Sequence, residues 1–200
     1  MRGRCATNLR RPPRSEPGVH HHAAVSSTAG TGVTDLAVAV QHPNMRAFFA
    51  VIRAGETSAT DDDAYRALFG WQSGKPGHMF GSFADHPRVA VMSRWGWTSA
   101  AGAYQAMAAV PGKVKTDTWG DFIRSTGPHD FSPISQDLFA AWCIRRRGAI
   151  DAVIHGRLWE AIDRCKREWA SLPGSPYGQP TRTAVAAALT YSRFGGTGES

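Results

Sequence analysis

One glutamate falls where a helix would direct it toward the protein core. Four apolar residues before it have the i, i+3, i+4, i+7 spacing of an amphipathic helix: Met45, Phe48, Phe49 and Ile52. Continuing by four from Ile52 leads to Glu56, and Gly55 favours a helix end there. A half-buried carboxylic acid has a raised pKa, which suits a general acid near neutral pH. The pattern also fits a solvated glutamate beyond a frayed helix end.

Three other groups of residues invite a chemical interpretation. The run Asp61–Asp63 suggests calcium, but the EF-hand spacing is absent, which favours a solvated turn. Asp85 and His86 could form an acid–base pair, although no serine or cysteine nucleophile stands beside them, and a loop with Asp85 bonded to backbone is the better interpretation. Tyr104 and Gln105 offer an amphipathic ring and a neutral donor and acceptor, which suit carbohydrate but also ordinary packing.

A stiff loop near the C-terminus contains a second pair of this kind. Two prolines and two glycines surround it: Pro173, Gly174, Pro176 and Gly178. Tyr177 and Gln179 in this loop could form a lip over a sugar chain. The loop could equally be a helix connector with a buried tyrosine.

The sequence predicts neither a metal site nor a cofactor. Cys5, Cys143 and Cys165 lack Cys/His ligand spacing and give no disulfide framework. The run His20–His22 could bind a transition metal, but such a tract in an unstructured tail more often binds nothing relevant.

Composition predicts one domain with a basic tail. The chain has 200 residues, 42% of them hydrophobic, and a net charge of +7. Residues 1–42 lack periodicity and hold five arginines, so we expect a disordered tail before a domain at 43–200. No basic groove is evident outside Arg145–Arg147, so we expect no nucleic-acid partner. No apolar run reaches the ~20 residues of a membrane span, and the tail lacks the apolar region of a signal peptide.

The predicted elements form a mostly helical domain with a small antiparallel sheet. Asn44 is expected to cap the first helix, and Ser132 with Pro133 to begin a later one whose apolar stripe includes Ile134. A small-residue helix is expected to open at Thr98, and the last helix to run from Val185 to Phe194.

Two further sets of elements follow from the pattern. Strands are expected at Tyr65–Trp71, His78–Phe83 and Val89–Trp97. A helix is expected to present an apolar stripe from Leu158 to Trp169.

Six stretches in order resemble the lambda-type phage endolysins, family 104 of the glycoside hydrolases. They cover roughly residues 45–195 and are Asp85–Arg88, Ala101–Gln105, Asp130–Asp137, Arg147–Ala149, Ala161–Cys165 and Trp169–Gln179. The resemblance implies an α+β, lysozyme-like fold with a saccharide cleft. It also implies cleavage of the MurNAc–GlcNAc β-1,4 bond of peptidoglycan with release of a 1,6-anhydro-MurNAc end.

The resemblance also assigns roles to residues. The family's catalytic glutamate ends its first core helix in a Ser-Glu-Gly-Thr context, which Glu56 matches with different neighbours. Asp85, Tyr177 and Gln179 then belong to the lips of the cleft, and Tyr104 and Gln105 join them as expected sugar contacts. We expect a monomer that stays cytoplasmic until a holin-type pore protein releases it to the wall.

The few glutamates of this chain agree with a reaction that uses a single carboxyl group as acid and base. The chain has five glutamates: Glu16, Glu56, Glu160, Glu168 and Glu199. Glu16 and Glu199 lie near the chain ends, Glu160 on a polar helix face, and Glu168 off the apolar stripe, which leaves Glu56. Two alternatives stay open. One is a hydrolytic lysozyme that uses Asp61, Asp62, Asp63 or Asp85 as second carboxylate. The other is a non-catalytic wall-binding module.

Overall fold

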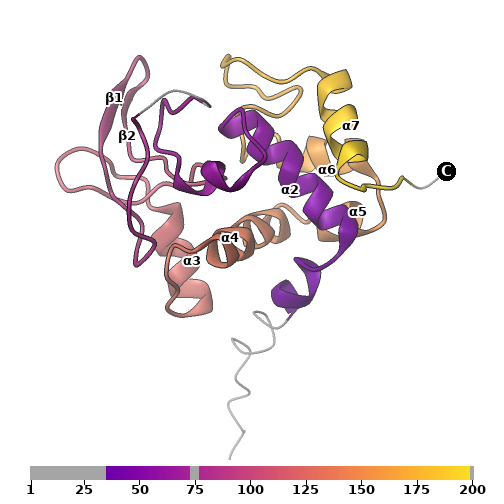
Figure 1. Cartoon of the computed structure of the whole chain (residues 1–200), viewed down its shortest axis with the longest axis horizontal. Helices are drawn as coiled ribbons and strands as arrows, with labels where there is room; N and C mark the ends of the chain where they lie inside the picture. Colours follow the sequence, from indigo (N-terminus) through magenta and orange to yellow (C-terminus); the bar gives the residue numbers. More distant parts are fainter. Residues whose placement is uncertain (1–34, 73–76, 199–200) are drawn as a thin grey trace, which may run out of the picture.

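The central helix of the molecule ends at the predicted glutamate. The computed structural model describes residues 35–72 and 77–198. Helix α2 (Pro43–Glu56) crosses the middle of the molecule, and helices α5 (Ile150–Ile154) and α7 (Ala184–Arg193) pack against it (Figure 1). Its apolar stripe is buried as predicted, since Met45, Phe48, Phe49 and Ile52 all lie in the core. The pattern therefore places Glu56 correctly at the helix end.

The start of α2 differs from the prediction by two residues. His42 is the N-cap, its Nδ1 accepts from the Asn44 N–H at 3.2 Å, and Pro43 occupies the first turn. Asn44 is buried instead, donating to the Ile154 carbonyl at 2.9 Å and accepting from the Thr197 N–H at 2.8 Å. An asparagine with buried backbone partners ties α2 to the C-terminal segment rather than capping the helix.

The later helices confirm most of the predictions made from the apolar periodicity. Helix α4 (Pro133–Arg146) begins at the predicted cap, where Ser132 accepts from the Ser135 N–H, but Ile134 is exposed rather than buried. Helix α6 (Leu158–Cys165) ends earlier than its apolar stripe, although Trp169 beyond it is still buried. Helix α3 (Thr118–Thr126) was not predicted.

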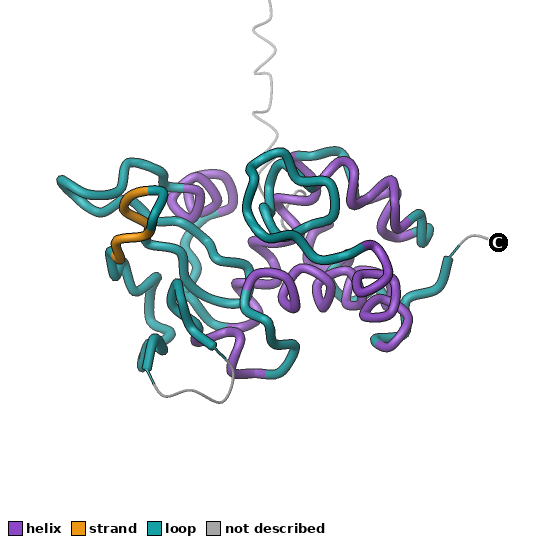
Figure 2. Tube along the Cα trace, turned by 90° about the horizontal axis from the view of Figure 1, so that it is seen from above, coloured by secondary structure: helices purple, strands orange, loops and turns teal. Residues whose placement is uncertain are grey.

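The small sheet is reduced to one hairpin. Strands β1 (Val91–Ser93) and β2 (Gly96–Thr98) pair antiparallel, so the stretch predicted as one strand, Val89–Trp97, instead folds back on itself at Arg94 and Trp95. The other two predicted strands are wrong, because Asp62–Arg66 forms the 3-10 helix η1 and Ala67 makes an isolated bridge to Met79. In Figure 2 the hairpin lies at one end of the molecule and the C-terminal helices lie toward the other.

The predicted small-residue helix after Thr98 is a tight turn. Gly102 has φ of 75°, and a Cβ there would lie 2.2 Å from Gln136 Oε1. Buried Gln136 accepts from the Ala103 N–H at 2.9 Å and donates to the carbonyls of Tyr65 and Phe131. Only glycine allows this approach of α4 to the turn, which fixes the residues that follow it.

The folded domain begins before the predicted boundary at residue 43. Residues 35–39 are helical, and Leu36 is 2% exposed within the core. The predicted tail is therefore too long at its C-terminal end. Leu36, Ala39 and Val40 form a buried stripe at i, i+3, i+4 that spans little more than one helical turn, too short to stand out as a periodic pattern. Residues 1–34 lie outside the described part of the chain.

Candidate functional site

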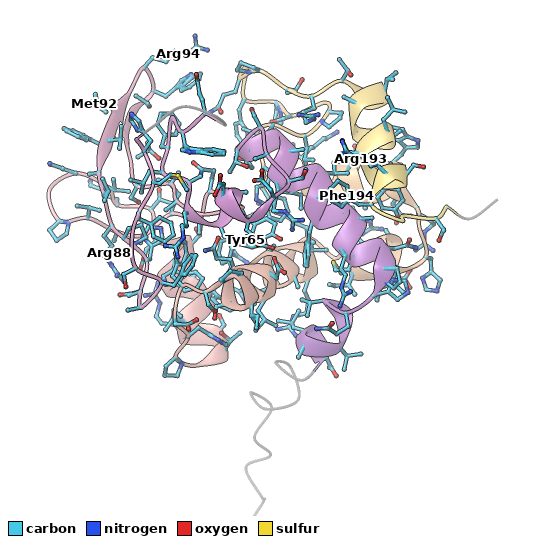
Figure 3. All side chains as sticks on the ribbon, viewed as in Figure 1. Tyr65, Arg88, Met92, Arg94, Arg193 and Phe194 are labelled. Carbon is cyan, nitrogen blue, oxygen red and sulfur yellow. The ribbon has the colours of Figure 1, made fainter. Side chains whose placement is uncertain are left out.

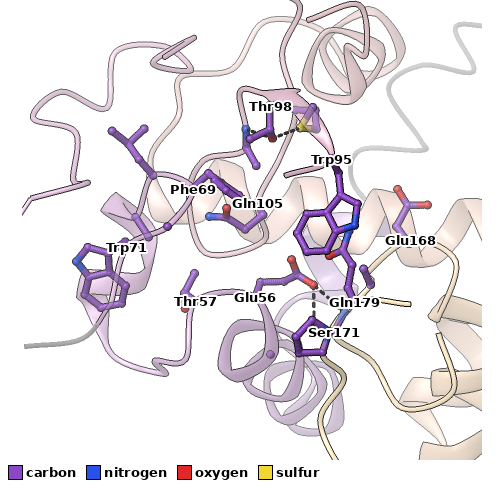
Figure 4. Close-up of a pocket in the computed structure, with 18 residues that line it drawn as sticks. Glu56, Thr57, Phe69, Trp71, Trp95, Thr98, Gln105, Glu168, Ser171 and Gln179 are labelled. Atoms are coloured by element: carbon purple, nitrogen blue, oxygen red, sulfur yellow. Dashed lines mark hydrogen bonds between the residues drawn. The ribbon is translucent and has the colours of Figure 1, made fainter. Parts of the chain in front are cut away.

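The end of α2 opens into a cavity of about 490 Å³. Its walls come from segments far apart in the sequence, with polar side chains from Glu56, Thr57, Thr98, Gln105, Glu168, Ser171 and Gln179, and aromatic ones from Phe69, Trp71 and Trp95. Figure 4 shows the Glu56 carboxyl with Ser171 on one side and Gln105 and Trp95 on the other. A cavity of aromatic surfaces with a few convergent polar groups is typical of a ligand site.

Glu56 is a half-buried acid with a single hydrogen-bonding neighbour among the described residues. The Ser171 hydroxyl donates to Oε1 at 2.6 Å, and the Ser171 N–H donates to the same oxygen at 3.4 Å. Burial raises the pKa of Glu56, because desolvation disfavours the charged carboxylate, and the two hydrogen bonds from Ser171 oppose that rise. The result is an acid biased toward its protonated form, as a proton donor requires.

The C-terminal loop is fastened tightly against the end of α2. A Cβ on Gly55 would lie 2.8 Å from the Cβ of Ser171, so glycine permits the close approach. Arg182 donates from its backbone to the Ser171 carbonyl and from Nη1 to the Ala54 carbonyl, both at 2.8 Å. These contacts hold Ser171 at the carboxyl of Glu56.

Gln105 and Gln179 lie where the sequence predicts, in the wall of the Glu56 cavity. Gln105 has φ of 49°, and its side chain donates to the Gly102 carbonyl at 2.9 Å, so the turn fixes its direction. Gln179 is partly exposed and comes from the stiff C-terminal loop. Their placement brings both side chains to the wall of the cavity, within reach of a ligand there.

The predicted sugar contact at Tyr104 is wrong, because this side chain is 2% exposed and belongs to the core. Its hydroxyl donates to Asp137 Oδ1 and accepts from Arg53 Nη1 at 3.0 Å. Tyr65 also donates to Asp137, at 2.8 Å. Burial raises the pKa of Asp137 and of both tyrosines. This buried network joins α2 to α4 behind the cavity.

The structure places Asp85 outside the Glu56 cavity, so its predicted contact with the glycan finds no support in the cavity wall. Asp85 pairs with Arg88 and accepts from the His86 N–H at 2.6 Å, and it lines a separate hollow with Asp117 and Arg124. His86 accepts from the Arg88 N–H at Nδ1 and therefore donates from Nε2 to the Ala106 carbonyl at 2.9 Å. Burial lowers the pKa of His86 to about 4, so the ring is neutral. The structural-loop interpretation of Asp85 is confirmed.

Tyr177 is neither buried nor in the cavity wall. Its side chain is exposed, and its hydroxyl donates to the Arg167 carbonyl at 2.9 Å. The connector interpretation with a buried tyrosine is therefore wrong. Tyr177 lies outside the wall of the Glu56 cavity, and its role as a lip over a sugar chain stays a prediction. Tyr177 stiffens the loop that carries its neighbour Gln179.

Three functional candidates escaped the sequence reasoning. Ser171 gave no signal beyond lying in a stretch that resembles the endolysins. Glu168 lies off the apolar stripe of the expected helix, which predicts no role for it, yet it lines the cavity and pairs with Arg147 at 2.7 Å. Trp95 lay within a predicted strand, where tryptophan is ordinary.

The described residues contain neither a candidate metal-ligand group nor a membrane-spanning helix. Within residues 35–72 and 77–198 there is no group of three potential metal ligands. His20–His22 lies outside the described residues. Across the same part of the chain, no helix has both the length and the apolar character needed to cross a membrane.

Comparison with known proteins agrees with this geometry. The Endolysin family model matches residues 46–198. The endolysin of Escherichia phage P2 is 33% identical, covering 78% of this chain and 94% of its own. The endolysin of Escherichia phage lambda is 36% identical over 122 residues, which are 60% of this chain and 72% of its own.

Solved structures give the same result for the fold. The lysozyme of bacteriophage lambda matches with a TM-score of 0.63 at 31% identity, over 78% of this chain and 97% of the lambda chain. The lambda lysozyme complexed with a chitohexasaccharide matches with a TM-score of 0.66 at 29% identity, with the same coverage. The chain therefore has a lysozyme-like α+β fold and belongs to the endolysin family, as a phage endolysin of the lambda type.

Proposed function

We propose that this endolysin, a peptidoglycan-degrading enzyme, cleaves the MurNAc–GlcNAc β-1,4 bond by lytic transglycosylation, with Glu56 as the sole acid and base. The observation that carries the proposal is Glu56 itself, a half-buried acid with a raised pKa in the wall of a ligand-sized cavity. The chitohexasaccharide complex of the lambda relative supports a glycan strand as the occupant.

The first step uses the protonated form of Glu56. Its carboxyl donates a proton to the glycosidic oxygen as the bond from that oxygen to C1 of MurNAc breaks. Ser171 holds Oε1 through two hydrogen bonds, so we assign the transferred proton to Oε2, which accepts no hydrogen bond from the described residues. Burial raises the pKa of this carboxyl, which favours the protonated form that the first step needs.

The second step closes the anhydro ring. The C6 hydroxyl of the same MurNAc attacks C1, and the Glu56 carboxylate takes the hydroxyl proton. This returns Glu56 to its protonated form and leaves a 1,6-anhydro end. The N-acetyl group of the substrate can stabilise the intermediate, so the nucleophile and its support both belong to the glycan.

The placement of the other carboxylates supports this reaction over hydrolysis. Asp61, Asp62 and Asp63 are exposed and do not line the cavity, and Asp85 lines a different hollow. Glu168 is the second carboxylate in the cavity wall, and a hydrolytic lysozyme would use it. Its ion pair with Arg147 instead occupies Oε2, with distances of 2.7 and 2.8 Å.

Mass spectrometry of digested peptidoglycan sacculi tests the proposal. The expected products carry 1,6-anhydro-MurNAc ends, and Glu168→Gln protein is expected to release the same products. Reducing MurNAc ends that disappear in Glu168→Gln would establish hydrolysis. No soluble products from folded protein would support the non-catalytic wall-binding alternative.

We also propose how the enzyme acts in the host. It accumulates in the cytoplasm as a monomer and reaches the wall when a holin-type protein opens the inner membrane. Expression of the chain alone is then expected to leave cells intact, and co-expression with a holin to lyse them. Lysis by the chain alone would contradict this dependence.

A further inference from the structure

We infer that Trp95 is a stacking platform for a pyranose ring of the glycan strand, an inference that rests on the proposed function. Trp95 is 52% exposed at the turn of the β1–β2 hairpin, yet its side chain lines the Glu56 cavity. A pyranose ring has an apolar face of C–H groups, which packs on an aromatic ring and removes both from water.

Hydrogen bonds within the turn hold the backbone of Trp95 in a defined conformation. Ser93 and Gly96 pair across the turn, so Arg94 and Trp95 are its two central residues. The Trp95 N–H donates to the Ser93 hydroxyl at 3.1 Å, and that hydroxyl donates to the Gly96 carbonyl at 2.8 Å. Little further ordering of the turn is needed on binding, which lowers the entropic cost of binding.

Arg94 defines which face of the indole is available. Its guanidinium carbon lies 4.0 Å from the centroid of the Trp95 ring, a cation–π contact that covers one face. Figure 3 shows Arg94 at the outer tip of the hairpin, and Figure 4 shows Trp95 directed into the cavity. The second face is left for a ligand.

Two other exposed tryptophans lack this combination. Trp97 has Lys113 over its ring at 4.6 Å and does not line the cavity. Trp159 is also 52% exposed, but it lines a separate hollow beside α7. Trp159 is therefore a control of the same residue type and exposure outside the proposed platform.

Binding without turnover gives the sharpest test. Chitohexaose is titrated calorimetrically into Glu56→Gln protein, and the same titration is run with Trp95→Ala or Trp159→Ala added. We expect Trp95→Ala to weaken binding roughly 5- to 30-fold, as for loss of one aromatic contact, and Trp159→Ala to leave binding unchanged. Trp95→Phe should recover part of the affinity.

Steady-state kinetics on sacculi give a second test, and its outcomes distinguish this inference from the proposed function. On sacculi, Trp95→Ala alone should raise KM while kcat and the melting temperature stay near wild-type values. Equal chitohexaose affinity with and without Trp95 would overturn the platform while the proposed function stands. Failure of the Glu56→Gln protein itself to bind, together with no products from wild-type digests, would overturn both.

Discussion

The hydroxyl of Ser171 lies 2.6 Å from Oε1 of Glu56, although 115 positions separate the two residues in the chain. This hydrogen bond stabilises the ionised carboxylate, while burial stabilises the protonated acid. The balance sets the pKa of the proposed proton donor. The hydrogen-bonded environment of this proposed acid is therefore complete only when the C-terminal loop has packed against α2.

Replacing Glu56 with glutamine is expected to abolish lysis while leaving the fold intact. The amide cannot donate and retrieve a proton, so turnover should fall at least ~10²–10⁴-fold. The pKa of Glu56 is higher in the folded than in the unfolded protein. The free energy of unfolding therefore falls as pH rises from the unfolded-state pKa to the folded-state pKa. The variant should therefore melt no lower than wild type at pH 7. Calorimetry measures the melting temperature, and lysis of chloroform-treated Gram-negative cells measures the activity. Lysis at the wild-type rate would exclude Glu56 as the proton donor.

Removing the Ser171 hydroxyl is expected to shift the pH profile. Activity requires protonated Glu56, so kcat/KM falls as pH rises through the pKa of this group. Ser171→Ala removes a hydrogen bond that lowers that pKa, and the descending limb should move to higher pH. Thr57→Val is the control, since the Thr57 hydroxyl donates to the Arg53 carbonyl and not to Glu56. A shift to lower pH in Ser171→Ala would contradict the assignment.

Gln179 and Tyr177 should respond differently to truncation. Gln179 lines the cavity, so Gln179→Ala is expected to raise KM severalfold with an unchanged melting temperature. Tyr177 is exposed and its hydroxyl bonds to backbone, so Tyr177→Ala should change KM less. Steady-state kinetics on sacculi compare the two variants. A larger KM effect at Tyr177 would place that ring on the glycan despite its position outside the cavity.

The start of the folded domain can be located with two neighbouring substitutions. Leu36 is 2% exposed and Val38 is 70% exposed. Leu36→Ala should lower the free energy of unfolding by about 2–5 kcal/mol, because it leaves a cavity in the core. Val38→Ala should change it by less than about 0.5 kcal/mol. Denaturant unfolding measures both, and equal effects would show that residues 35–40 do not belong to the core.

Local sequence determined the parts of this protein that depend on short-range periodicity. The apolar spacing from Met45 to Ile52 fixes the buried face of α2 and places Glu56 at its end. Ser132 followed by Pro133 similarly specifies where α4 begins, because a cap satisfies backbone groups within three residues. The six stretches that resemble the endolysins, taken in chain order, identified the family.

Tertiary structure decided which side chains share the cavity. Tyr104 and Gln105 are adjacent in sequence, yet the turn at Gly102 sends one into the core and the other into the cavity wall. Glu168 and Trp95 carry no local signal for the site, because their roles depend on the approach of segments far from α2. Ser171 reaches Glu56 only because the distant loop packs beside Gly55. Contacts of this range come from the packing of the whole core, which no local pattern encodes.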